Sequence, residues 1–173
     1  VTQVQIDSHG QMTFPVALRS LLRQDPQVLM IGEIRDAETA RIAIEAGLTG
    51  HLLMSTMHSG SCSGALLRML EMGIEPYPVT SGITAILNQR LVRRLCEHCK
   101  RQAADGTFEA VGCAECHQTG YHGRMLLAEI VELDGALRKA ILEKQDMEQL
   151  EAILVARGHM SLQHDGRRLV AQG

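Results

Sequence analysis

The stretch Val28-Leu29-Met30-Ile31-Gly32-Glu33-Ile34-Arg35-Asp36 decides the fold of this chain. Four consecutive apolar residues closed by a glycine are typical of a strand buried in a parallel sheet. Acidic side chains follow at once, where such a strand would end. Open α/β sheets bind their ligands just beyond the carboxyl ends of their strands. The stretch therefore predicts a fully buried strand with a candidate ligand site directly after it.

Strands and helices alternate around this stretch. The sequence predicts a strand over 2–6, a helix over 13–24, a helix from Asp36 or Ala37 to Gly47, a strand over 51–56, a helix from Ser61 or Ser63 to Gly73, and a helix that follows Pro76 and Pro78 and runs to about Asn88. Repeated βα units of this kind build a parallel sheet with helices on both faces. We therefore expect an α/β fold.

Two neighbouring strands of this predicted sheet carry polar side chains at the same edge. In P-loop nucleotide hydrolases an acid in the place of Glu33 holds Mg²⁺ through water or orients the attacking water. His58, after the next strand, could donate a hydrogen bond to a terminal phosphate, or it could be a turn histidine bonded to the backbone. Asp36 is better explained as the N-cap of the following helix. Glu33 and His58 are therefore the candidate catalytic residues.

Arg19 and Arg23 lie four residues apart on one face of the first predicted helix. They could reach a phosphate group, or they could form an ordinary solvated charged face. The loop that cradles phosphate has the form GxxxxGK[ST]. No lysine of the chain follows a glycine, so these 173 residues do not contain that loop.

Four cysteines form two matched pairs, Cys96-x2-Cys99 and Cys113-x2-Cys116. Two such turns bring four thiolates to one tetrahedral ion, most often zinc, and this explanation is favoured over redox chemistry or chance. A closed four-thiolate site leaves no position for a substrate, so we expect the ion to be structural. The surrounding residues 96–123 predict a small knuckle, whereas Cys62 is expected to be an ordinary buried residue.

The sequence predicts three parts: residues 1–95 as the sheet-containing core, 96–123 as the zinc knuckle, and 124–173 as a strand followed by helices. That strand is expected over 125–133, with two or three short helices from Asp134 onward. Because the chain starts at Val1 and not at methionine, we expect it to be part of a longer protein.

The composition argues against two classes of partner. The net charge is -3 and aromatic residues make up 2% of the chain, so a nucleic-acid binder with basic clusters and stacking rings is disfavoured. No apolar run reaches the roughly 18–20 residues of a membrane span.

The ordered motifs resemble those of the secretion ATPases, the motors of type II secretion and type IV pilus assembly. The matching segments are Leu22-Arg23-Gln24-Asp25-Pro26 and Gly32-Glu33-Ile34-Arg35-Asp36 (Walker B region), Leu48 to Leu52 and Ser55 to His58 (histidine box), Gly73-Ile74-Glu75-Pro76, Gln89 to Arg93, the two cysteine pairs, and Gly120-Tyr121-x-Gly123-Arg124. The resemblance covers nearly the whole chain.

The resemblance implies a partial RecA-like core of the P-loop NTPase class, with parallel sheet, zinc knuckle and C-terminal helices. It implies ATP and Mg²⁺ as cofactors of the complete protein, Glu33 as the Walker B acid, and His58 facing the γ-phosphate. Arg19 and Arg23 match positively charged positions near the nucleotide.

The family works as a hexamer at the cytoplasmic face of the inner membrane and passes force to a membrane platform protein. Its N-terminal domain, Walker A loop and aspartate box are expected before Val1, so the chain alone is expected to be inactive. The tetracysteine knuckle favours the secretion and assembly branches over the retraction motors. The rival hypothesis is a non-catalytic, zinc-stabilised protein-binding module.

Overall fold

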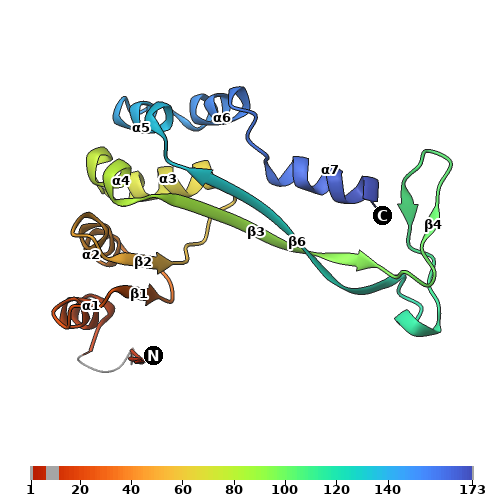
Figure 1. Ribbon diagram of the computed structural model, residues 1–173, viewed down its shortest axis with the longest axis horizontal. Coiled ribbons are helices and arrows are strands. Elements are labelled where there is room, and N and C mark those ends of the chain that lie inside the picture. The colour runs from red at the N-terminus through yellow and green to blue at the C-terminus, as the bar shows by residue number, and fades with distance from the viewer. Residues whose placement is uncertain (1, 7–11, 173) are drawn as a thin grey trace. The chain divides into compact units, whose positions relative to one another are not determined.

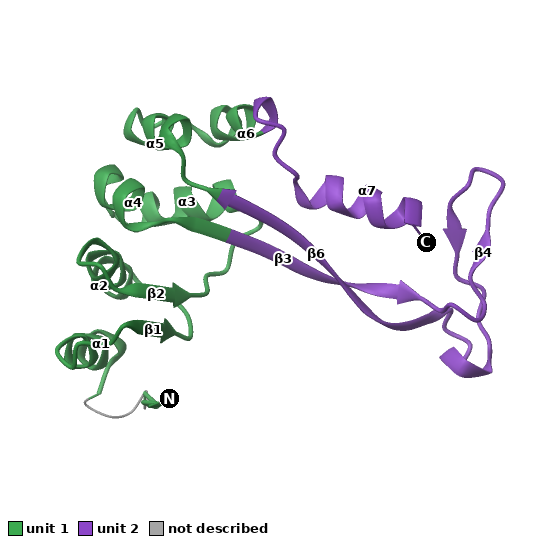
Figure 2. Ribbon diagram, viewed as in Figure 1, with its two compact units in different colours: residues 1–86, 132–154 green, residues 87–131, 155–173 purple. Residues whose placement is uncertain are grey.

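The computed structural model describes residues 2–6 and 12–172 and has an α/β fold (Figure 1). The chain divides into two compact units (Figure 2). Unit 1 comprises residues 1–86 and 132–154, and unit 2 comprises residues 87–131 and 155–173. The chain therefore passes between the units three times.

Unit 1 contains a parallel pair of strands, β1 (Val28–Ile31) and β2 (Leu52–Ser55). Val28 is paired with Leu52 and Ile31 with Ser55, so both strands end at the same edge. Leu29 and Ile31 are buried, whereas Val28 and Met30 are exposed. The prediction of a fully buried strand is therefore wrong for one face, because helices of the described chain cover only the other.

The described residues of unit 1 also form six helices: α1 (Phe14–Leu22), α2 (Ala37–Leu48), α3 (Cys62–Glu71), α4 (Pro76–Gly82), α5 (Gly135–Leu142) and α6 (Met147–Ala156). Unit 1 ends at Leu154, so the last two residues of α6 belong to unit 2. Helix α2 packs against β2, α1 and α4, and α4 also packs against α3 and α5. The predicted caps are confirmed, because Asp36 accepts from the Thr39 N–H at 2.8 Å and Ser61 accepts from the Gly64 N–H at 3.0 Å.

Two glycines allow α2 and α4 to approach each other closely. A Cβ atom at Gly47 would lie 2.8 Å from the Gly82 carbonyl oxygen, and one at Gly82 would lie 2.8 Å from Ile44 Cγ2. Such distances leave no room for a side chain, so glycine is required at both positions for this packing.

Unit 2 is built on a ribbon of two strands, β3 (Ala85–Leu95) and β6 (Tyr121–Glu132), which run in opposite directions (Figure 1). Both strands cross the boundary with unit 1 (Figure 2). Between them the chain forms the short antiparallel pair β4 (Arg101–Gln102) and β5 (Phe108–Glu109) and the turn η1 (Ala114–Cys116). Helix α7 (Leu162–Gln172) ends the chain.

Two predicted elements are wrong. Residues 2–6 form no strand, since no described segment pairs with them. The helix expected to reach Asn88 ends at Gly82, where Ile83 adopts an extended conformation (φ -100°, ψ 125°). From Ala85 the backbone pairs with β6, a long-range partner that local periodicity cannot reveal.

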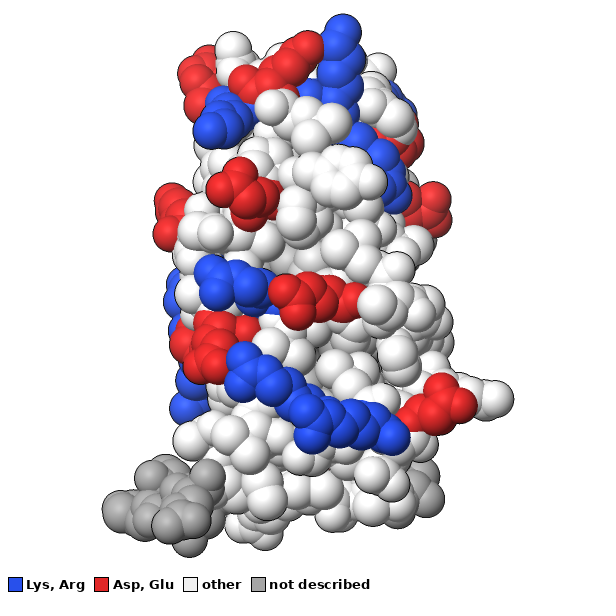
Figure 3. All heavy atoms as spheres, turned by 90° about the vertical axis from the view of Figure 1, so that its left-hand side faces the viewer, with Lys and Arg blue, Asp and Glu red and all other residues white. Residues whose placement is uncertain are grey.

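Charged side chains of both signs are interspersed on the face of unit 1 that carries α1, α2, α4 and α5 (Figure 3). Among the described residues, no helix combines the length and apolar character needed to cross a membrane.

Candidate functional site

Hydrogen bonds fasten together the segments that follow β1 and β2. The Ile34 N–H donates to the Thr56 carbonyl at 2.9 Å, and Thr56 Oγ1 donates to the Gly32 carbonyl at 2.6 Å. These bonds fix the backbone on either side of Glu33. The carboxyl ends of the two parallel strands are thus held as one edge, from which nearby side chains can act together.

Glu33 and His58 meet at this edge. Glu33 Oε1 lies 3.1 Å from His58 Nε2, and Arg35 Nε donates to Glu33 Oε2 at 2.6 Å. Both carboxylate oxygens are thereby oriented. The Glu33 side chain is 19% exposed, against 89% for His58 and 80% for Arg35. A largely buried acid is therefore flanked by two exposed nitrogen-bearing side chains that are accessible to a ligand.

The other sequence candidates lie apart from this pair. Arg19 Nη2 bonds Glu38 Oε1 at 2.9 Å, between α1 and α2, and both side chains are about half exposed. Arg23 is exposed at the C-cap of α1. Within the described chain, neither arginine contacts Glu33 or His58. The structure thus brings together two of the four candidates.

Arg35 is the residue that sequence reasoning left out of the site. It lies two residues after Glu33, and in extended backbone that spacing puts two side chains on the same side. The signal was therefore present, but opposite charges two apart are usually an ordinary surface pair.

A second cluster, in unit 2, contains Cys96, Cys99, Cys113 and Cys116. Their Sγ atoms all lie within 4.8 Å of one another. The separations are 3.9 Å for the first and third, and 3.8 Å from Cys116 to both Cys99 and Cys113. A tetrahedral ion with metal–sulfur bonds of about 2.3 Å requires sulfur separations of about 3.8 Å. The four free thiols therefore match the dimensions of a tetrahedral metal site.

Backbone N–H groups surround these sulfur atoms. Cys116 Sγ accepts from the N–H groups of Cys113 and Gly120, both at 3.2 Å, and Cys99 Sγ accepts from Gly112 at 3.3 Å. Such donors stabilise negative charge on thiolate ligands and orient them. These N–H···S hydrogen bonds are a second feature of the cluster that is suited to binding a cation.

Two of these thiols, Cys116 and Cys99, have pKa values that are shifted in opposite directions. Burial opposes ionisation of Cys116, but the N–H groups of Cys113 and Gly120 and the neighbouring thiols outweigh it and lower its pKa to about 6. Burial and the neighbouring thiols raise the pKa of Cys99 to about 11, against the opposing Gly112 N–H. The lowered pKa of Cys116 favours the thiolate form that binds a cation, whereas the raised pKa of Cys99 favours its thiol form.

Comparison with known proteins gives these sites a context. The model of the family described as "Type II/IV secretion system protein" matches residues 1–173. The chain belongs to this family. The predicted membership among the type II secretion and pilus-assembly proteins is thereby confirmed.

Three relatives, which are type II secretion and type IV pilus proteins, align with the whole chain. Type II secretion system protein HxcR of Pseudomonas aeruginosa is 45% identical over 173 residues, which are 37% of its length. Putative type II secretion system protein E of Escherichia coli is 43% identical over 189 residues, 38% of its length. Type IV pilus assembly ATPase PilB of Thermus thermophilus is 37% identical over 191 residues, 22% of its length. The chain thus spans less than two fifths of these relatives.

Solved structures show the same fold. The pilus retraction motor PilT with bound ADP superposes with a TM-score of 0.71 at 24% identity, covering 96% of this chain and 42% of PilT. The Legionella pneumophila ATPase DotB gives a TM-score of 0.67 at 24% identity, covering 93% of this chain and 39% of DotB. This chain therefore shares its α/β fold with these two ATPases.

Proposed function

We propose that this chain is the C-terminal portion of a secretion ATPase motor that couples ATP hydrolysis to pseudopilus or pilus assembly and protein secretion. The observation that carries the proposal is the Glu33 carboxylate, held by His58 and Arg35 at the common edge of two parallel strands. A ligand-binding edge in this place is the general rule for open α/β sheets. Family membership and the ATPase relatives support a nucleotide as the ligand.

Glu33 is proposed to act on the attacking water. Its carboxylate is contacted from both sides and its side chain is only 19% exposed, which suits an acid that must hold a water molecule or a hydrated Mg²⁺ in one direction. Magnesium, when bound, neutralises charge on the phosphates. Glu33 would hold it through water.

His58 is proposed to face the γ-phosphate. Its exposed imidazole can leave Glu33 and donate to a phosphate oxygen, so its hydrogen bond would report whether the γ-phosphate is present. Arg19 and Arg23 are proposed to contribute positive charge near the nucleotide. For Arg19 this requires exchange of its exposed bond to Glu38, which costs little because surface ion pairs are weak.

The phosphate grip is proposed to come from polypeptide outside these 173 residues, because the chain has no GxxxxGK[ST] sequence. The isolated chain is therefore expected to be inactive. In the complete protein we propose a homohexamer on the cytoplasmic face of the inner membrane, working with the membrane platform of the secretion apparatus. The tetracysteine cluster is proposed to hold structural zinc, since a closed four-thiolate site suits that ion.

The test uses the complete parent protein and the substitution Glu33→Gln, which keeps size and removes charge. Because the acid is expected to orient or deprotonate water, magnesium-dependent ATP turnover should fall by roughly a hundredfold or more. Binding of a non-hydrolysable ATP analogue, measured by titration, should be retained.

The matched control is Glu143→Gln at the C-cap of α5, an exposed glutamate whose Oε1 lies 3.7 Å from Lys139 Nζ. Its turnover should equal that of the unsubstituted protein. Unchanged turnover in Glu33→Gln would contradict the proposal and favour the non-catalytic binding module.

A further inference from the structure

Helix α7 differs from the other helices in what it buries. Within α7, all of whose residues the structure describes, the one buried residue is Asp165, at 6% exposure. Helix α5, by contrast, buries Leu137, Ala140 and Ile141. Apolar burial is what usually holds a helix to its neighbours, and in α7 the apolar side chains Leu162 and Leu169 are only partly buried, so polar contacts must contribute much of its attachment.

The first contact is made by Asp165 itself. Its Oδ2 accepts from the Ala128 N–H of β6 at 3.0 Å, and its Oδ1 accepts from Arg168 Nε at 3.0 Å and Nη2 at 2.7 Å. The Arg168 side chain is 49% exposed, so the ion pair is only partly buried, and the cost of burying the Asp165 carboxylate offsets much of the stability that its bonds contribute.

The second contact lies just before α7. His159 Nε2 is 3.2 Å from Glu129 Oε1 on β6, and the two side chains are 13% and 8% exposed. Asn88 Nδ2 on β3 donates to Glu129 Oε2 at 3.3 Å, and Arg90 Nη1 donates to Asn88 Oδ1 at 3.1 Å. Both contacts hold the beginning of α7, and both are polar.

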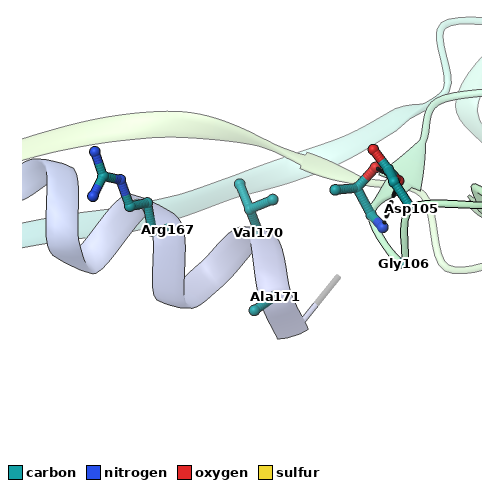
Figure 4. A pocket seen from close by; sticks show the side chains of 7 residues that line it. Asp105, Gly106, Arg167, Val170 and Ala171 are labelled. Atoms are coloured by element: carbon teal, nitrogen blue, oxygen red, sulfur yellow. Dashed lines mark hydrogen bonds between the residues drawn. The ribbon is translucent and has the colours of Figure 1, made fainter.

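The other end of α7 borders open space. Gly166, Arg167, Val170 and Ala171 face Asp105, Gly106 and Thr107 of the β4–β5 turn across a hollow of about 530 Å³ (Figure 4). Val170 is 58% exposed. The last two turns of α7 are therefore not packed against the hairpin.

A short loop joins α7 to the rest of the chain and allows this weakly attached helix to move. Two of the three crossings between the units are the strands of the ribbon, and the third falls within α6, between Leu154 and Val155 (Figure 2). The loop that joins α6 to α7 contains Gly158, which has a φ of +69° and, apart from its chain neighbours, no atom within 4 Å of the place a Cβ would take. A glycine in this conformation has the freedom that a hinge requires.

We propose that α7 is a polar latch, which detaches from the β3–β6 ribbon as a unit about Gly158 while both units stay folded. Closed, it holds residues 159–172 against β6 through Glu129 and the Ala128 N–H. Open, it uncovers both of these groups, so this part of unit 2 has two states.

Hydrogen exchange on the 173-residue protein tests the latch. The amides of 162–172 and of Ala128 should exchange together, and at least tenfold faster than those of Leu137 and Ile141 in α5, because latch opening needs no global unfolding. Asp165→Asn should speed exchange at Ala128 and α7 by roughly tenfold more, since it removes the charge that Arg168 pairs with. Exchange in α5 should not change.

Two further variants keep the test decisive. Arg168→Gln leaves Asp165 in place and should produce the same selective effect, smaller in size, even if Asp165→Asn folds poorly. Asp25→Asn makes the same chemical change at an exposed position of unit 1 and should alter nothing in α7. The latch is overturned if α7 and α5 exchange at one common rate, or if Asp165→Asn and Arg168→Gln leave the Ala128 amide unchanged or accelerate α5 equally.

Discussion

The two units of this protein are stabilised by different physics. Unit 1 buries a large apolar core, in which Leu66, Leu137, Ile141 and Leu150 are fully covered. In the described part of unit 2, the only buried hydrophobic side chains are Cys96, Cys116 and Val131. Three polar side chains, Asn88, Glu129 and Asp165, are buried there as well. Unit 2 therefore depends on sulfur ligands and polar bonds, and should respond to metal and pH where unit 1 should not.

Removal of the proposed zinc ion should have the largest effect on this difference between the units. Structural zinc binds with an apparent free energy of about 10–16 kcal/mol at neutral pH, and residues 96–123 have few apolar contacts to replace it. A chelator should therefore speed hydrogen exchange across 96–123 and leave α5 protected. Elemental analysis of the purified protein should give one zinc per chain.

The cysteines offer their own control. Cys99→Ser should lose the metal, whereas Cys62→Ser, in the core of unit 1, should keep it. Protein purified without chelator that carries no metal and has four free thiols would contradict the zinc assignment.

The second largest effect is expected from a cavity in the apolar core of unit 1, which should lower the stability of that unit. Leu66 is fully buried, so Leu66→Ala should lower the free energy of unfolding by about 2–5 kcal/mol in urea titration. Leu91→Ala, an exposed position on β3, should change it by less than about 0.5 kcal/mol. Equal losses in the two variants would show that the contrast between the units is not real.

Acid should have the smallest effect and should act on α7. The Ala128 N–H and the Arg168 guanidinium hold the pKa of Asp165 below its usual 3.8. A lowered carboxyl pKa contributes stability that is complete above the unfolded value and is lost as pH falls through the folded value. Protection of the α7 amides, measured as exchange corrected for the intrinsic rate at each pH, should therefore fall below about pH 4, earlier than protection of α5.

In Asp165→Asn this acid-dependent loss of amide protection in α7 should disappear, because no group is left to titrate at that position. Persistence of the same pH profile in the variant would assign the acid sensitivity to another group.

Local patterns predicted much of the fold. The run over 28–31, the caps Asp36 and Ser61, and the helices of unit 1 apart from the end of α4 follow from neighbouring residues, which is why they were found. Strand β3 was missed because its partner β6 lies far along the chain, and alternation in Ala85–Leu95 is blurred by arginines. The exposure of Val28 and Met30 was missed because an apolar run does not say how many of its faces are covered.

The sites divide in the same way. The cysteine pairs carry their geometry in their spacing, so their clustering was predictable, and the meeting of Glu33 with His58 followed from adjacent parallel strands. The contact between Glu129 and His159 was not predictable, since the residues are thirty apart and no local pattern distinguishes them from surface groups.

The account rests on Glu33 and His58 acting in one nucleotide site, and a double-mutant cycle of ATP turnover in the complete parent protein tests this most directly. Glu33→Gln, His58→Ala and the double variant should be compared under saturating ATP and magnesium. If the two residues act as a unit, the double variant should be about as slow as Glu33→Gln alone. Losses that multiply as for independent sites would contradict the shared site.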